Sequence, residues 1–253
     1  HIRSRRQRQM CIRDRAEESV RAAERRLQDA LDWAKTETLL KPNAQVGPLQ
    51  ASTHMLAVSS SQGSLRASLG FANELYLHRS SGEGLHFRDR VGPSMNGSLR
   101  DIRSFLERRY GQDRFGGQGF VFSFEERHVG KDGPSATALC TLLVDSVMGG
   151  WEMSPDFTMT GAMSPSGEVE EIGGLPEKIW AAMVKGCNVV AAPWENRLDL
   201  SDLVILDGIG AIGDCQVFGV KTFEEARRLA TVDRPQEIEA AIQLYASTME
   251  ALG

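Results

Sequence analysis

Between residues 94 and 230, short apolar segments alternate with segments whose apolar residues recur every three or four positions. The first pattern is typical of buried strands, and the second is typical of helices with one buried face. Helices are predicted at 94–110, 134–148, 176–185 and 222–230, and strands at 119–125, 157–161, 168–172, 188–192 and 215–220. The alternation therefore predicts one main domain that contains both helices and strands.

The regions on either side of this pattern predict separate elements. Residues 53–90 hold short apolar segments between serine and glycine clusters, as hairpin strands do. Residues 41–52 contain two prolines and are predicted to be a linker. Helical spacing of apolar residues predicts an amphipathic helix at 16–40 and a further helix at 235–252. We therefore divide the chain into a tail at 1–15, a helix and linker at 16–51, a main domain at 52–232 and a C-terminal helix at 233–253.

Residues 1–15 carry six arginines and one aspartate, whereas the whole chain has a formal net charge of -5. Clustered guanidinium groups attract phosphates, so one interpretation is an arm that binds nucleic acid or an anionic membrane. However, the stretch RQRQMCIRDR resembles translated sequencing-adapter sequence, and we interpret residues 1–15 as a non-native tail. We therefore predict no nucleic-acid partner.

Composition and missing motifs narrow the function. The 253 residues are 41% hydrophobic, which is enough for one substantial core. No apolar run reaches the roughly 18 residues of a membrane helix, so no membrane association is predicted. Cys140, Cys187 and Cys215 stand in apolar surroundings and are predicted to be reduced, which favours a cytoplasmic protein. The chain has no CxxC, HExxH or GxSxG motif, so no metal or other cofactor is predicted.

Ser135 and Lys178 are the candidate catalytic residues. A serine hydroxyl needs a base to become a nucleophile, and a lysine can be that base only while its amine is neutral. Lys178 lies in the first turn of a predicted helix, where the helix dipole disfavours an ammonium group. Its apolar neighbours Leu175, Ile179 and Trp180 can desolvate the amine, and both effects lower the pKa of a lysine.

Ser135 follows Asp132-Gly133-Pro134 at the start of another predicted helix. Proline suits the first helical position, and the N–H groups at a helix start lack partners within the helix, so they are available for an oxyanion hole. Taken singly, these residues have plainer interpretations. Ser135 and Asp132 can be helix caps, and Lys178 can be an ordinary solvated lysine.

The motifs around these residues resemble the Lon protease family, whose proteolytic domain is similar to residues 85–230 of this chain. The segment around Ser135 resembles the one that carries the family's nucleophile, and the segment around Lys178 resembles the one that carries its catalytic lysine. The two residues are 43 positions apart, as in the family. The similar segments are VGPSMNGSLRDIRSFL (91–106), KDGPSA (131–136), MTG (159–161), GGLPEK (173–178), PWENRLDL (193–200) and VKTFEEARRLA (220–230).

This resemblance implies an α+β fold related to a domain of a ribosomal small-subunit protein. The helices predicted from spacing at 16–40 and 235–252 are appendages to that fold. The resemblance also implies a serine endopeptidase in which Ser135 is the nucleophile, Lys178 the general base and Thr160 a hydrogen-bonding support. Further site residues next to the nucleophile are Asp132, Gly133, Pro134 and Ala136. The implied partners are protein or peptide substrates, other copies of the chain in a ring that is commonly hexameric, and a separate ATPase. We expect activity without an ATPase module in this chain.

Two departures from the family pattern leave alternatives open. Glycine is usual where Thr137 stands, and an acidic residue is usual where Ala162 stands, which motivates a non-catalytic module for binding or assembly. A small-molecule kinase of the same superfold is another alternative, in which Lys131 and the adjacent helix start bind phosphate. Its glycine-poor loop argues against that. His128 is an alternative base for Ser135, because imidazole is the commoner partner of a serine.

Overall fold

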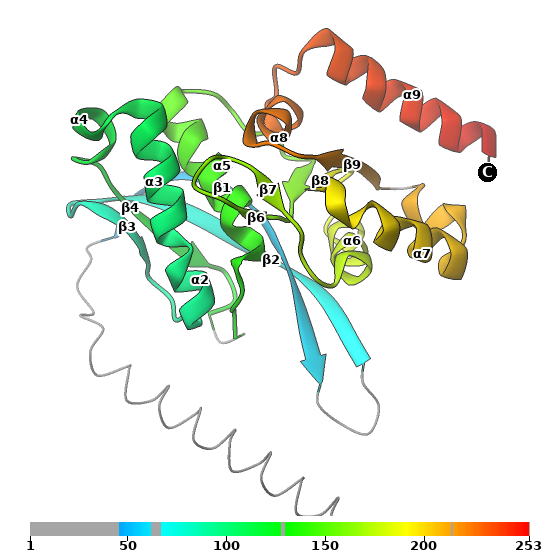
Figure 1. Cartoon of the computed structure of the whole chain (residues 1–253), viewed down its shortest axis with the longest axis horizontal. Helices are drawn as coiled ribbons and strands as arrows, with labels where there is room; N and C mark the ends of the chain where they lie inside the picture. Colours follow the sequence, from blue (N-terminus) through cyan, green and yellow to red (C-terminus); the bar gives the residue numbers. More distant parts are fainter. Residues whose placement is uncertain (1–45, 62–66, 128–129, 214, 253) are drawn as a thin grey trace, which may run out of the picture. The chain divides into compact units, whose positions relative to one another are not determined.

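The computed structural model of the chain describes residues 46–61, 67–127, 130–213 and 215–252 (Figure 1). The predicted tail at 1–15 and the predicted amphipathic helix at 16–40 lie outside the described residues, so both stay predictions. The described part mixes helices with three small sheets and is compatible with the predicted α+β class. Among the helices described, none combines the length and apolar character needed to cross a bilayer.

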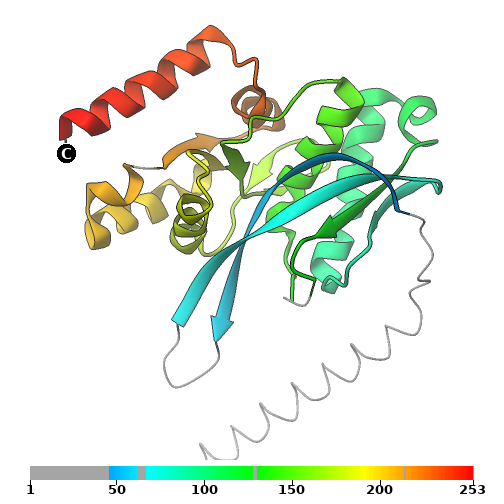
Figure 2. The ribbon, with the colours of Figure 1, turned by 180° about the vertical axis from the view of Figure 1, so that it is seen from behind.

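The largest sheet has the strand order β1-β2-β4-β3. Its strands are β1 (Val46–Ser61), β2 (Ala67–Ser80), β3 (Gly84–Phe87) and β4 (Gly119–Phe124). Strands β1 and β2 form a long antiparallel hairpin whose end projects away from the helices (Figures 1 and 2). The sequence predicted hairpin strands here, but as shorter pieces. Leu75 and Leu77 of β2 are buried whereas Tyr76 and His78 are half-buried, as expected of a strand with one covered face.

Strand β1 begins earlier than the sequence indicated. Gly47 and Pro48 fall within it, although residues 41–52 were predicted to interrupt regular structure, so that prediction is wrong from residue 46 onward. The pairing with β2 shifts register on both sides of Leu49, next to the proline. Because β1 is an edge strand of this sheet among the described residues, the missing N–H of Pro48 costs little there.

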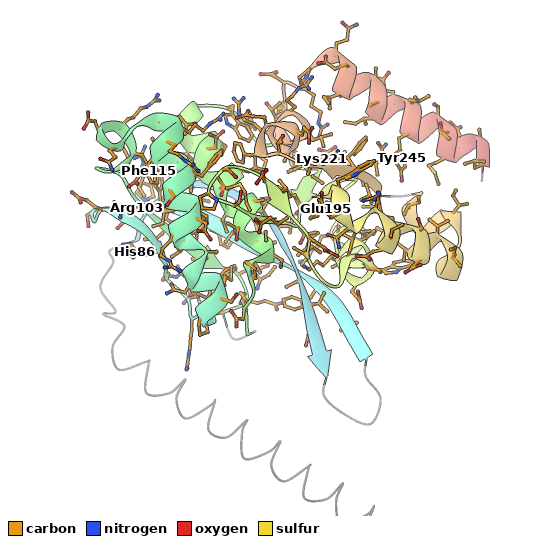
Figure 3. The ribbon with its side chains drawn as sticks, in the orientation of Figure 1. His86, Arg103, Phe115, Glu195, Lys221 and Tyr245 are labelled. Carbon is orange, nitrogen blue, oxygen red and sulfur yellow. The ribbon has the colours of Figure 1, made fainter. Side chains whose placement is uncertain are left out.

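Helices cover one face of this sheet (Figures 1 and 2). They are α2 (Pro93–Gly97), α3 (Leu99–Tyr110) and α5 (Thr137–Gly149). The single helix predicted at 94–110 is therefore two helices that break at Ser98, whose hydroxyl donates to the Met95 carbonyl at 2.7 Å. Helix α4 (Gln112–Phe115), which was not predicted from the sequence, places Phe115 in the core (Figure 3).

The second sheet is parallel and has the order β5-β8-β9. Its strands are β5 (Phe157–Met159), β8 (Val189–Pro193) and β9 (Gln216–Val220), and its covering helices include α6 (Leu175–Val184) and α8 (Phe223–Ala230). Val189 and Ala191 of β8 pack in the core that includes α8, whereas Val190 and Ala192 pack in the core that includes α6. Both faces of β8 are thus buried, which explains its continuous apolar sequence.

The remaining elements are short or peripheral. A small hairpin pairs β6 (Ala162–Met163), which was not predicted, with β7 (Val169–Glu170), which lies within the predicted returning strand at 168–172. The loop predicted at 193–199 is instead helical, with η2 (Trp194–Asn196) leading into α7 (Arg197–Asp207) and η3 (Ile209–Ile212). The C-terminal helix is confirmed as α9 (Gln236–Leu252), whose Tyr245 ring packs 5.9 Å from that of Phe218 on β9 (Figure 3).

Candidate active site

A cavity of about 370 Å³ lies where the β1–β2 hairpin, the loop before α5 and the start of α6 meet. Met55–Val58 of β1 form one wall, and residues 171–173 contribute to another. The loop at 130–136, Met95 of α2 and Lys178 complete the lining. Ser135 and Lys178, which are 43 positions apart in the sequence, therefore border the same cavity.

Ser135 sits in η1 (Pro134–Ala136), a single turn that leads directly into α5. Its carbonyl accepts hydrogen bonds from the Gly161 N–H at 2.8 Å and from Thr160 Oγ1 at 3.2 Å. The Ala138 N–H donates in return to the Gly161 carbonyl at 3.2 Å. The turn is thereby fixed to the segment that follows β5. The Ser135 hydroxyl itself has no hydrogen-bond partner among the described residues, and the side chain is half-buried beside the cavity.

Lys178 lies in the first turn of α6, as the sequence predicted. Its amide donates to the carbonyl of Gly174, the N-cap residue, at 3.2 Å. Its side chain is only 3% exposed, and Nζ donates to Thr160 Oγ1 at 3.2 Å. Burial lowers the pKa of Lys178 from 10.5 to about 8, against the opposing effect of the Glu177 carboxylate. A substantial fraction of this amine is therefore neutral in mildly alkaline solution.

Thr160 connects the two candidates. The residue is fully buried, and its N–H donates to the Ala191 carbonyl of β8 at 3.1 Å. Its hydroxyl accepts from Lys178 Nζ and donates to the Ser135 carbonyl. Because Lys178 donates an N–H to the Thr160 hydroxyl, the nitrogen lone pair of a neutral Lys178 amine is not used in this hydrogen bond. The lone pair can therefore accept a proton from another group. The structure thus brings the three residues together, and their catalytic roles stay predictions.

The other predicted site residues have different surroundings. Asp132 is exposed, and its Oδ1 accepts from the Met95 N–H at 3.1 Å and the Gly133 N–H at 2.8 Å, so it joins the loop to the start of α2. Gly133 and Pro134 line the cavity beside Ser135. Ala136 also borders the cavity and is otherwise buried in the core.

Lys131 is held by the protein itself. It is 4% exposed, its Nζ lies 4.6 Å from the centre of the Phe124 ring, and it donates to the Glu126 carbonyl. Burial lowers its pKa. These contacts tie the loop to the end of β4 and do not favour the phosphate-binding role of the kinase alternative. His128, the alternative base, lies outside the described residues.

The apolar wall of the cavity was not predicted from the sequence. Met55 and Leu56 of β1, Met95 of α2 and Ile172 before α6 all line it and are buried. The only local signal was the apolar segment at 55–58, which by itself indicates a strand and not a binding surface.

Comparisons with known proteins agree with the location of this site. The family model described as "Lon protease (S16) C-terminal proteolytic domain" matches residues 91–208. The Lon protease of Escherichia coli K12 is 40% identical over 110 residues, which are 43% of this chain and 13% of the relative. The Lon protease of Neorickettsia sennetsu is 36% identical over 122 residues, which are 45% of this chain and 14% of the relative. The Lon protease of Mycoplasmopsis agalactiae is 32% identical over 137 residues, which are 51% of this chain and 14% of the relative. The chain thus spans about one-seventh of the length of these relatives.

Proposed function

Residues 91–208 belong to the Lon protease (S16) proteolytic-domain family, and from this premise we propose that the chain is a serine endopeptidase with a Ser135–Lys178 dyad. The observation that carries the proposal is the buried amine of Lys178. Lys178 borders the same cavity as Ser135, its amine is linked to the Ser135 carbonyl through the Thr160 hydroxyl, and its pKa is lowered to about 8. A buried lysine with one hydrogen-bond partner is poorly explained as a structural group.

In the proposed reaction, Ser135 Oγ attacks the carbonyl carbon of the scissile peptide bond while its proton passes to neutral Lys178 Nζ. The resulting Lys178 ammonium then donates that proton to the leaving amine, and an acyl-enzyme forms. Lys178, neutral again, takes a proton from water, which attacks the ester. The Lys178 ammonium then returns that proton to Ser135 Oγ as the ester bond breaks, which releases the acid product and restores the free enzyme. The backbone N–H groups of Ser135 and Ala136, which follow Pro134 in η1, are the proposed donors to the developing oxyanion.

The wall formed by β1 suggests how substrate is held. Among the strands described, β1 is the outermost of its sheet, and its residues Met55–Val58 border the cavity. The edge of a strand presents backbone donors and acceptors to which an extended peptide can add. We therefore propose that the substrates are unfolded segments of protein, since a folded segment has its backbone groups already paired.

The proposal is tested with a serine-directed phosphonate and unfolded casein. We expect the reagent to attach to Ser135, as mapped by mass spectrometry, and new peptide termini to accumulate in the casein. Ser201→Ala changes an exposed serine of α7 and serves as the matched control. We expect this variant to be labelled at Ser135 to the same extent as wild type. Casein cleavage that persists in Ser135→Ala would remove the dyad. A wild-type chain that neither reacts nor cleaves would support the non-catalytic alternative.

The pH dependence of the reaction follows from the lowered pKa of Lys178. The amine must be neutral to act as a base, so kcat/KM should rise with pH and level off above the pKa of about 8. Between about pH 7 and about pH 9 we expect an increase of about tenfold, which is the change in the neutral fraction. The measurement is kcat/KM for a fluorogenic peptide in buffers of equal ionic strength. A rise centred near pH 6.5 would instead indicate a histidine base.

The resemblance also underlies proposals about assembly. We keep as predictions a homo-oligomeric ring, a separate ATPase partner and a cytoplasmic location. The relation of the fold to a ribosomal-protein domain also stays a prediction.

A further inference from the structure

One cross-strand pair of the β1–β2 hairpin touches the helix that carries Lys178. Val58 of β1 is paired with Gly70 of β2. A Cβ atom at Gly70 would lie 1.7 Å from the carbonyl oxygen of Glu177, so β2 and the first turn of α6 meet backbone to backbone. On β1, the Val58 side chain contacts the residue before α6, because a Cβ atom added at Gly174 would lie 2.7 Å from Val58 Cγ2. The hairpin and the start of α6 are thus in contact at both members of this pair.

These two contacts involve residues that adjoin Lys178 in the sequence or bind its backbone. Glu177 precedes it directly, and Gly174 accepts its amide hydrogen bond. Gly174 is also the N-cap of α6 and has a φ of 70°, a conformation that glycine adopts without strain. The position of the lysine backbone therefore follows the position of the hairpin. Val58 also lines the cavity, so the hairpin shapes the substrate wall and supports the base at the same place.

We propose that Gly70 is a positioning residue, which sets how far Lys178 reaches toward Thr160 and Ser135 by letting β2 contact the carbonyl of Glu177. The inference rests on the proposed peptidase function. A larger residue at position 70 would meet a backbone atom, which no side-chain rotation can move aside. The start of α6 would have to shift by roughly 1 Å, and a misplacement of that size costs an enzyme about 100-fold in rate.

The test compares Gly70→Ala with Gly117→Ala, a matched control at an exposed glycine whose added Cβ meets no atom within 4 Å. We expect Gly70→Ala to lower kcat by about 10- to 100-fold with little change in KM, and to move the rise of kcat with pH to higher pH, because a displaced amine is more hydrated. Gly117→Ala should match wild type. A Gly70→Ala enzyme with a lower melting temperature but an unchanged kcat and pH profile would show a purely structural glycine and overturn the proposal.

A second readout separates this proposal from the peptidase function. The rate at which acetic anhydride modifies Lys178, followed by mass spectrometry against pH, reports the titration of the amine without any catalysis. The midpoint should lie near 8 in wild type and higher in Gly70→Ala. If wild type cleaves no substrate but the midpoint moves as expected, the positioning role stands and the peptidase function falls. If wild type cleaves and Gly70→Ala leaves both the midpoint and kcat unchanged, only the positioning role falls.

A third variant decides the question if Gly70→Ala does not fold. Val58→Ala removes the methyl group that lies against Gly174 and loosens the same contact from the other strand. We expect the acetylation midpoint of Lys178 to move in the same direction by a smaller amount. A midpoint identical to that of wild type would overturn the proposal.

Discussion

Lys178→Met is expected to lower kcat/KM by about 10²- to 10⁴-fold, the usual contribution of a general base, while making the protein more stable. The two effects have one cause. Wild type must bury an ammonium group in a site where the side chain is 3% exposed, and Nζ has the Thr160 hydroxyl as its hydrogen-bond acceptor. Methionine fills a similar volume without a charge, and Thr160 keeps its bond to the Ser135 carbonyl.

The expected gain follows from the pKa. The gap between about 8 in the folded state and the ordinary value of 10.5 corresponds to about 3 kcal/mol in the free energy of unfolding. Below pH 8 the lysine is charged in both states, so the variant has its full advantage. Between 8 and 10.5 the unfolded wild type binds more protons than the folded form, so wild type gains stability as pH rises and the difference shrinks.

Denaturant unfolding of both proteins at pH 7 and pH 10, with peptidase assays on the same samples, measures both effects. Lys185→Met is the matched control, because it removes an exposed lysine at the end of the same helix and should change neither quantity. A Lys178→Met protein that retains activity would exclude this lysine as the base. A Lys178→Met protein that is less stable than wild type at pH 7 would show that burying the Lys178 ammonium does not lower the free energy of unfolding.

Asp145→Asn is expected to destabilise the protein by about 3 to 5 kcal/mol, the usual cost of breaking a buried ion pair. The Asp145 side chain is fully buried near the end of α5. Arg109 Nε lies 2.6 Å from Oδ1, and Arg227 Nε lies 3.2 Å from Oδ2. The Tyr110 hydroxyl donates to Oδ1 at 2.7 Å, and Trp151 Nε1 donates to Oδ2 at 2.9 Å.

An asparagine cannot replace this carboxylate. It has one acceptor oxygen in place of two, so its NH₂ group would face a donor, and the two arginines would lose their shared counter-charge. Burial and the hydrogen bond to Asp145 raise the pKa of Tyr110 to about 12, which keeps that hydroxyl a donor throughout the working pH range. The carboxylate is thus surrounded by donors only.

The measurement is urea unfolding at neutral pH. Asp202→Asn, at an exposed position of α7, is the control and should leave the free energy of unfolding within about 0.5 kcal/mol of wild type. At temperatures where Asp145→Asn remains folded, its kcat/KM should equal that of wild type, because Asp145 lies about 12 Å along α5 from the turn that carries Ser135. Unchanged stability would mean that the buried carboxylate contributes nothing to the fold.

Elements with strong local signals could be predicted from the sequence. Strand β4 and helices α5, α6 and α8 lie close to their predicted bounds. Helix α8 also begins with a capping box formed by Thr222 and Glu225, with both reciprocal hydrogen bonds present. The predictions failed where long-range packing decides the conformation. Helix α4 holds only four residues, too few for a periodic pattern, and β1 continues through a proline because its outer edge needs no partner.

The residues of the candidate site could be named from the sequence, but not how they are joined. The bridge through Thr160 depends on the pairing of β5 with β8, which places the Thr160 N–H at the Ala191 carbonyl. Pairing between strands 30 residues apart leaves no local trace in either strand. Asp145 does have a local signal, because it is the single carboxylate in the apolar sequence of α5. Its arginine partners, however, come from α3 and α8 and could not be identified from the sequence.

The burial of α5 has a consequence for how such a site can be adjusted. Eleven of its residues are buried, and the turn with Ser135 runs directly into it, so the proposed nucleophile is anchored to a helix of the core. Close-packed interiors resist small displacements. Lys178, by contrast, lies in the first turn of α6, which contacts the projecting β1–β2 hairpin. If Lys178 is the base, as proposed, substitutions in the β1–β2 hairpin can adjust its position, whereas the Ser135 hydroxyl moves only if the core is repacked.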